Sequence, residues 1–108
     1  MDEHEFERHA AEAWKRVLDL FDEVDPDDAD VEPSGDVIRI DFRGGRRVVL
    51  NTQRPARQIW LAGGARAWHF SFEPESGRWY DDKGRGDELL ATLAALTKEA
   101  IGLELSIS

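Results

Sequence analysis

The sequence predicts an α+β fold in which a helix at each end of the chain covers the same face of an antiparallel sheet. Three observations support this prediction: helical periodicity at both ends, short segments that alternate apolar and polar residues between them, and Gly-Gly pairs that separate some of these segments. The order helix, about five to six antiparallel strands, helix is typical of a two-layer α-β sandwich. A chain of 108 residues has room for a single domain over residues 1–108 with one core.

Two segments have the spacing of amphipathic helices. The first is expected from Glu3 to Val24, with Asp2 and Glu5 as a capping box at its start. The second is expected from Asp87 to Ile101. In each helix the apolar residues recur at steps of three and four and define one buried face. These residues are Phe6, Ala10, Ala13, Trp14, Val17, Phe21 and Val24 in the first helix, and Leu89, Leu90, Leu93, Leu96, Ala100 and Ile101 in the second.

The region between the helices alternates as strands do, because successive side chains of a strand face opposite sides of the sheet. Gly44-Gly45 and Gly63-Gly64 are expected at hairpin turns, Asp25–Gly35 as a loop, and Asp82–Gly84 as a further turn. The tail Leu103–Ile107 either adds an edge strand or packs across the helices. The predicted strands are Val37–Phe42, Arg46–Asn51, a third strand after Pro55 that contains Gln58–Ala62, Ala67–Phe72 and Arg78–Asp81.

Composition limits the functions that are open to the chain. There is no Cys, which excludes disulfides, thiolate metal sites and Cys nucleophiles and fits a reducing cytoplasm. Formal net charge is −9, from 14 Lys and Arg against 23 Asp and Glu. Nucleic acid is therefore not expected as a partner, because binding phosphates requires a cationic surface. The apolar runs are too short for a membrane span, and the acidic start does not look like a targeting segment.

Negative charge is concentrated in one stretch, since no Lys or Arg occurs between Arg16 and Arg39. Asp19, Asp22 and Glu23 share one side of the first helix near its C-terminal end, where negative charge is unfavourable. The stretch does not fit a calcium-binding loop in either register, because Asp30 or Pro33 would occupy the position that requires Gly. Two interpretations remain: a cation-binding surface or a merely solvated acidic face.

Trp60 shares a strand face with Gln58, opposite the face of Ile59 and Leu61. It lies either in a second core layer or on an exposed sheet face as a contact residue. Because two helices cover only one face of the sheet, the exposed position is favoured. The uncovered face would then display Arg39, Asp41, Arg47, Asn51, Gln58, Trp60, His69 and Ser71.

The pattern Asn51-x-Gln53-x-Pro55-x-x-Gln58-Ile59-Trp60-Leu61, after an acidic helix and loop and before His69-Phe70, resembles the frataxin family. The resemblance implies a frataxin-like sandwich in a bacterial, cytoplasmic protein that assists iron-sulfur cluster assembly. It implies weak, exchangeable binding of iron, contact with a cysteine desulfurase and its scaffold protein, and a monomer without iron that is able to form oligomers with iron. The implied iron ligands are Asp19, Asp22, Glu23, Asp25, Asp27, Asp28 and Asp30, with Asp36 and Asp41 nearby. The predicted partner contacts are Trp60, Asn51, Gln58, Arg39 and Arg47.

An enzymatic alternative is a ferroxidase or an iron-storage protein. Such chemistry usually uses carboxylates and His that converge between helices, whereas the inward positions here are apolar. His4, His9 and His69 have no metal-ligand spacing and are interpreted as surface residues, with His4 placed to assist near the start of the first helix. Binding without turnover is therefore the favoured interpretation.

Overall fold

The structure is a computed structural model that describes residues 1–83 and 86–107. Within these residues, two helices and six strands follow one another along the chain. Gly84, which ends the turn predicted at Asp82–Gly84, lies outside the described residues. The elements are α1 (Glu3–Leu20), β1 (Ala29–Ser34), β2 (Val37–Phe42), β3 (Arg47–Gln53), β4 (Gln58–Gly63), β5 (Arg66–Glu73), β6 (Arg78–Asp81) and α2 (Leu89–Ile101).

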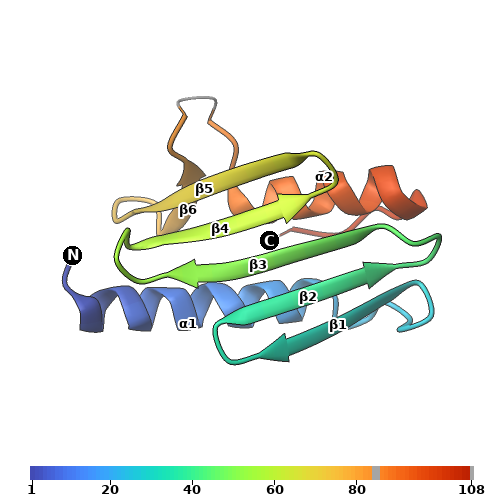
Figure 1. Cartoon of the computed structure of the whole chain (residues 1–108), viewed down its shortest axis with the longest axis horizontal. Helices are drawn as coiled ribbons and strands as arrows, with labels where there is room; N and C mark the ends of the chain where they lie inside the picture. The colour runs from blue at the N-terminus through green and yellow to red at the C-terminus, as the bar shows by residue number, and fades with distance from the viewer. Residues whose placement is uncertain (84–85, 108) are drawn as a thin grey trace.

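The strands form an antiparallel meander in which each strand pairs with the next along the chain, in the order β1-β2-β3-β4-β5-β6 (Figure 1). Short turns are sufficient for this topology because neighbouring strands run in opposite directions. The β2-β3 and β4-β5 hairpins therefore lie at one end of the sheet, and the β1-β2, β3-β4 and β5-β6 turns lie at the other. The end with the two hairpins also contains the C-terminal end of α1.

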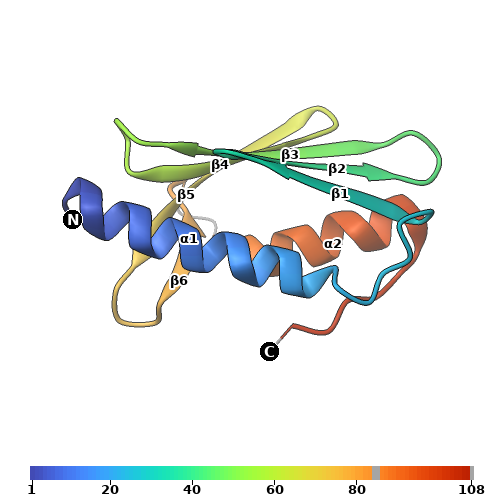
Figure 2. The same cartoon turned by 90° about the horizontal axis from the view of Figure 1, so that it is seen from below.

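Both helices pack against the same face of the sheet, as predicted (Figure 2). The core lies between these two layers. It includes Phe6 and Val17 from α1 and Leu93 from α2, none of them more than 1% exposed. The inward residues of the central strands, such as Leu50 and Phe70, are fully buried against them. The opposite face of the sheet has no helix over it within the described part of the chain, so its side chains are available for other contacts.

The acidic segment after α1 differs from the prediction in two ways. The helix ends at Leu20 rather than Val24, and Phe21 to Val24 form turns. Carboxylates near this end and the absence of a basic residue in the last turn make it an unfavourable place to extend the helix. Asp25–Gly35 is not a continuous loop, because Ala29–Ser34 forms the edge strand β1. Ala29 and Val31 face the core side while Asp30 and Glu32 face away, and Pro33 is tolerated because the strand lies at the sheet edge.

The C-terminal tail packs rather than pairs. No strand is present in residues 102–107, which run beneath the helices in Figure 2. Leu105 packs against the core, and an ion pair of 2.8 Å joins Lys98 Nζ on α2 to Glu104 Oε1. Of the two alternatives, packing across the helices is therefore the correct one. No helix within the described residues is both long and apolar enough to cross a lipid bilayer.

Candidate functional site: an acidic ridge and an uncovered sheet face

The acidic side chains form a surface at the hairpin end of the molecule, which we call the acidic ridge. It comprises the last turn of α1, the loop that follows and the start of β1 (Figure 1). All of its carboxylate residues are exposed except Asp28, which is half-buried. The structure therefore gathers the seven predicted iron ligands along one continuous segment. They are Asp19, Asp22, Glu23, Asp25, Asp27, Asp28 and Asp30.

Successive turns give the ridge its shape. Asp22 N–H donates to Asp19 C=O at 3.2 Å, and both Asp28 and Ala29 N–H donate to Asp25 C=O, at 2.8 and 3.0 Å. The side chain of Asp25 accepts from Asp27 N–H at 2.9 Å. This local bond is the usual reason for an Asp at the start of a turn. One oxygen of Asp25 is therefore already used by the backbone.

Two ridge carboxylates have protein counter-ions. Asp19 pairs with Lys15 at 3.2 Å one turn earlier on α1. Asp28 pairs with Arg43 of the β2-β3 turn, whose N–H also donates to Asp28 C=O at 2.8 Å. The other five ridge residues have no Lys or Arg partner in residues 1–83 and 86–107. Their negative charge is compensated only by water and mobile ions, which makes this surface attractive to cations.

The ridge does not form a closed ligand shell. No group of three or more His, Asp or Glu side chains that could hold a metal ion is present among the described residues. Carboxylate oxygens are the donors that iron ions accept readily. The donor chemistry therefore fits iron, but the arrangement fits hydrated ions that each contact one or two carboxylates.

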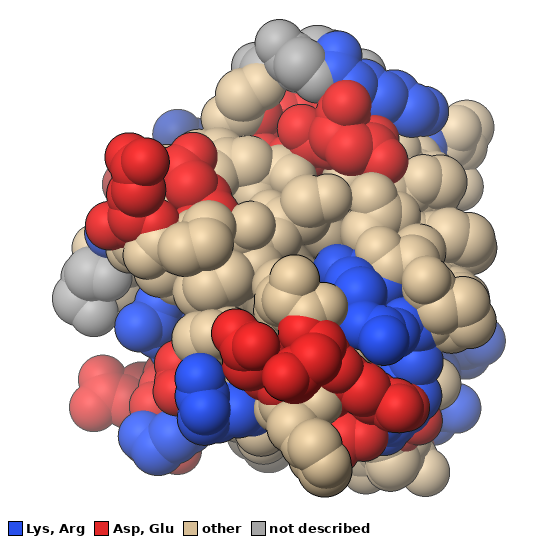
Figure 3. All heavy atoms as spheres, turned by 90° about the vertical axis from the view of Figure 1, so that its left-hand side faces the viewer, with Lys and Arg blue, Asp and Glu red and all other residues tan. Residues whose placement is uncertain are grey.

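The structure places Asp36 away from the ridge. Asp36 lies in the β1-β2 turn at the opposite end of the sheet, where Arg54 bridges it, at 3.1 Å, to Glu7 of α1. These ion pairs raise the pKa of Arg54 above its usual value, with the hydrogen bond to Asp36 as the largest cause. Acidic and basic side chains lie beside one another at this end of the molecule (Figure 3). Charge is thus locally balanced here and unbalanced on the ridge.

Asp41 lies close to the ridge, directly opposite Asp30 in the β1-β2 register. Its carboxylate accepts from Arg47 Nε at 2.6 Å and from Arg39 Nε at 3.0 Å. The hydrogen bond from Arg47, followed by the charges of both arginines, lowers the pKa of Asp41. Asp41 is therefore a neutralised carboxylate and not an additional free cation ligand.

Trp60 lies on the uncovered face, as predicted, and is half-buried there by its neighbours. Its ring stacks on His69 of β5, with centroids 4.3 Å apart and ring planes 17° apart. Its Nε1 donates to Oε1 of Gln58 at 2.9 Å. Nε2 of Gln58 in turn donates to Ser71 Oγ at 3.1 Å and to Asp82 Oδ2 at 2.9 Å. The indole is thus held in one orientation.

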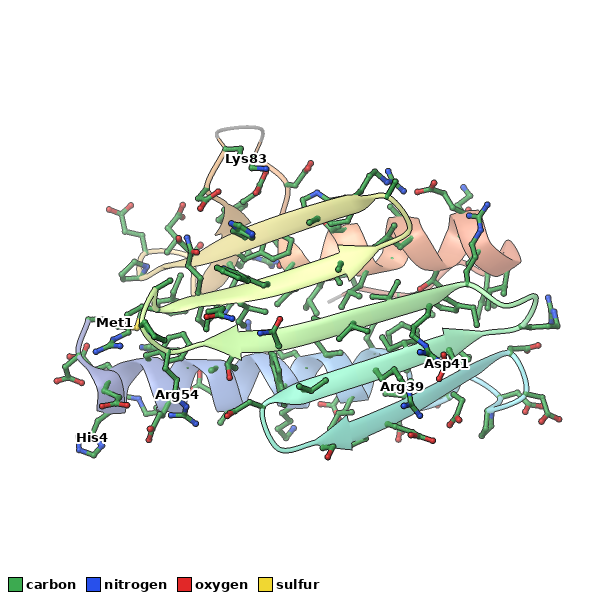
Figure 4. All side chains as sticks on the ribbon, in the orientation of Figure 1. Met1, His4, Arg39, Asp41, Arg54 and Lys83 are labelled. Atoms are coloured by element: carbon green, nitrogen blue, oxygen red, sulfur yellow. The ribbon has the colours of Figure 1, made fainter. Side chains whose placement is uncertain are left out.

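The remaining predicted contact residues divide the uncovered face into two parts. Asn51 pairs in register with Trp60 and extends the aromatic part. Arg39 and Arg47 belong to a charged part near β1, where Asp41 lies between them and Glu32 pairs with Arg39 (Figure 4). The roles of Glu32 and Asp82 are not visible in the sequence. Both contacts depend on strand register or on a turn that brings distant residues together, and no local spacing reveals them.

The His residues do not meet at any point of the structure. His4 projects from the N-terminal end of α1 (Figure 4), at the far end of that helix from the ridge. His69 lies on the uncovered face, but His9 is not a free surface residue. Its ring stacks on Phe72 with centroids 4.0 Å apart, and its Nδ1 lies 3.8 Å from Glu12 Oε2. The sequence interpretation of His9 as a surface residue is corrected, because packing against Phe72 of β5 leaves its side chain only partly exposed.

Fold and site together define a class: a two-layer α-β sandwich with an acidic ridge that is only partly compensated, beside a sheet face that presents an anchored Trp. The family model of the frataxin-like domain matches residues 1–103. The chain therefore belongs to the frataxin family.

Similar proteins are bacterial and eukaryotic. The iron-sulfur cluster assembly protein CyaY of Azotobacter vinelandii is 40% identical over 91 residues, which cover 84% of this chain and 81% of the relative. The protein of the same name from Pseudomonas syringae pv. tomato is 38% identical over 95 residues, with 87% and 84% covered. Frataxin from Psychromonas ingrahamii matches the structure with a TM-score of 0.90 and 25% identity, covering 100% of this chain and 99% of the other. A ferrous complex of trimeric frataxin from the yeast Saccharomyces cerevisiae matches with a TM-score of 0.73 and 29% identity, covering 88% and 87%.

Proposed function

We propose that this chain is a non-enzymatic accessory protein of iron-sulfur cluster assembly that binds iron weakly on the acidic ridge and contacts a cysteine desulfurase. The observation that carries this proposal is the ridge itself. Five of its seven carboxylate residues lack a Lys or Arg partner within the described residues, on a chain of formal charge −9. The names of the bacterial relatives support the assembly role, and the ferrous complex of the yeast relative supports iron as the ion. Both of these assembly relatives are bacterial, which supports a bacterial role, and we propose the cytoplasm as its compartment.

The physical basis for iron binding is relief of repulsion. Asp22, Glu23 and Asp25 are like charges in the turns that follow α1, and like charges that lie close together repel one another. A cation that contacts one or two of these carboxylates reduces this repulsion. Because these carboxylates are exposed and keep their water, the ion exchanges readily, and other divalent or trivalent ions compete for the same oxygens.

The same surface suits a basic patch on a desulfurase. Complementary charge steers association and raises its rate, and this contribution weakens as salt screens exposed charges over about 8 Å at physiological ionic strength. The uncovered face suits a second contact, with the scaffold protein, in which Trp60 supplies apolar area that depends little on salt. The ridge would therefore contribute electrostatic attraction, and the uncovered face would contribute apolar contact area.

The test is to neutralise part of the ridge and to measure both iron binding and association with the desulfurase. The variant Asp22→Asn, Glu23→Gln, Asp25→Asn should bind iron(II) more weakly and lose most of the salt-dependent part of its association rate with the desulfurase, while remaining folded. The matched control removes the same three charges elsewhere, as Glu3→Gln, Glu73→Gln and Glu75→Gln, all exposed. If both variants lose binding equally, net charge and not the ridge is responsible. Saturable oxidation of stoichiometric iron(II) on admitting oxygen would instead favour the ferroxidase alternative.

A further inference from the structure

A cavity of about 580 Å³ opens at the hairpin end of the molecule, between the β2-β3 and β4-β5 hairpins and the last turns of α2. We call it the hairpin-end cavity. Its floor is apolar: Phe42, Val48 and Leu96 line it, and each is less than 10% exposed. Ligand sites in proteins have volumes of roughly 300 to 1,000 Å³ and combine apolar walls with a few polar groups. The floor therefore suits an apolar group of one or two side chains.

Gly63 keeps this floor open. A Cβ at Gly63 would lie 3.3 Å from Cγ2 of Val48 and 3.5 Å from Cδ1 of Leu96. Its φ is not positive, unlike that of the adjacent Gly64, so the backbone conformation alone does not demand glycine here. The lack of a side chain at Gly63 leaves room on the cavity floor beside Val48 and Leu96. An alanine at this position would fill part of the floor without changing any charge.

The rim of the cavity is cationic, in contrast to the rest of the chain. Three arginines, Arg46, Arg47 and Arg66, and one carboxylate, Glu99, line it. Arg66 Nη2 lies 2.9 and 3.0 Å from the two oxygens of Glu99, and Arg47 pairs with Asp41. The guanidinium of Arg46 has no carboxylate partner within the described residues. One cation at the cavity mouth is therefore free to pair with a ligand.

The cavity and the acidic ridge belong to the same end of the protein. The β2-β3 turn joins them, since Arg43 pairs with Asp28 of the ridge while Arg46, three residues later, lines the cavity. Figure 1 shows both hairpins and the loop after α1 at this end. A protein that contacts the ridge can therefore reach the cavity with a neighbouring segment.

We propose that the hairpin-end cavity binds an acidic segment of a protein partner, with one apolar side chain on the floor and a carboxylate paired with Arg46. That the acidic segment belongs to a protein rests on the proposed function, in which the ridge beside the cavity contacts a protein partner. The partner surface is then bipolar: basic opposite the ridge and acidic opposite the cavity. Such an arrangement attracts the partner and also fixes its orientation, because the reversed orientation would place like charges together.

The experiment is an NMR titration of the isotope-labelled full chain with the peptide acetyl-Glu-Glu-Leu-Glu-Glu-amide. Saturable shifts are expected for the amides of Gly63, Gly64 and Leu96. Arg46→Ser, an exposed change that leaves the core intact, should weaken binding by about fivefold, the loss expected for one exposed ion pair. Gly63→Ala should weaken it by filling the floor. A peptide with Ser in place of Leu should bind more weakly than the parent, and one with Lys in place of Glu should not shift these amides.

Three results would overturn the proposal. They are the absence of saturable shifts, binding that neither variant changes, and equal binding of the Ser peptide, which would indicate charge attraction alone. Octanoate tests whether the ligand is a protein segment or a small carboxylate. If octanoate binds and its binding depends on Arg46 and Gly63, while the peptide does not bind, the ligand is a small carboxylate and a protein segment is excluded. Iron binding and desulfurase association, measured separately on the ridge variant, show whether the proposed function fails independently of the cavity.

Discussion

The indole Nε1 of Trp60 donates a hydrogen bond to the side-chain Oε1 of Gln58, two residues earlier on the same strand, at 2.9 Å. Both polar atoms of the Gln58 side-chain amide are engaged, since its Nε2 donates to Ser71 and Asp82. Gln58 is therefore a positioning residue for Trp60 as well as a member of the same surface. A contact residue that is already ordered loses less conformational entropy on binding, by roughly 0.5 to 1.5 kcal/mol for a side chain.

Replacing Trp60 by Ala should leave the fold and iron binding nearly intact and weaken association with the assembled desulfurase-scaffold complex. The stacking on His69 is lost, so a decrease of about 1 kcal/mol in the free energy of unfolding is expected. Urea unfolding measures the free energy of unfolding. Interferometry measures association with the desulfurase-scaffold complex. A loss of about 3 to 5 kcal/mol is typical of a truncated core aromatic, and would show that Trp60 is part of a core.

Replacing Gln58 by Ala should weaken the same association although Trp60 is still present, because the indole is no longer held. The indole N–H signal in an NMR spectrum should move and broaden as the ring samples more orientations. Gln53→Ala is the matched control: Gln53 pairs in register with Gln58 but takes no part in the hydrogen bonds to Trp60. Equal effects of the two substitutions on partner binding would contradict the positioning role.

Replacing Arg43 by Gln should strengthen cation binding on the ridge, because Arg43 is the counter-ion of Asp28 and competes with a metal ion for it. The cost in stability should be about 1 kcal/mol or less, since Arg43 is exposed and Asp28 is only half-buried. Isothermal titration with iron(II) under anaerobic conditions measures the change. Arg46→Gln removes an equal charge from the same hairpin without freeing a carboxylate. If Arg46→Gln strengthens iron binding as much as Arg43→Gln does, the change in net charge is responsible and not the release of Asp28.

Replacing Asp41 by Asn should destabilise the protein at neutral pH and make less difference in acid. Arg47 and Arg39 lower the pKa of Asp41 below its usual 3.8, so the folded state favours the carboxylate more than the unfolded state does. That stabilisation is fully present above the unfolded pKa and is lost as pH falls through the lower, folded pKa. The difference in unfolding free energy between the two proteins should therefore shrink below about pH 3.8. A difference that stays constant from pH 6 to pH 3 would contradict this account of Asp41.

The sheet and helices could be predicted because their signals are local. Alternation placed Ile38, Ile40 and Phe42 on the core side, and the three- and four-residue spacing placed Val17 and Leu93 there, all of which are buried. The edge strand β1 could not be predicted in the same way. Its sequence contains two acids and Pro33, which indicate a loop, and it becomes a strand only because β2 offers a free edge to pair with.

The candidate site was predictable in its residues but not in its contacts. The acidic stretch is visible as an absence of Lys and Arg from the sequence between Arg16 and Arg39. That Asp28 is paired with Arg43, and that Asp36 lies at the far end of the molecule, follows from strand direction and turn geometry. Long-range ion pairs of this kind have no sequence signature, because they join residues that only the folded topology brings together.

The proposed function depends above all on iron binding at the acidic ridge. An NMR titration of the labelled protein with iron(II) under anaerobic conditions tests it most directly, because the paramagnetic ion broadens amide signals near its binding site. Signals from Asp19 to Asp30 should broaden first and at the lowest iron concentration, and the variant Asp22→Asn, Glu23→Gln, Asp25→Asn should lose this selectivity. Initial broadening at His4 of α1, or at His69 or another part of the sheet, with the ridge signals still sharp, would show that iron binds elsewhere.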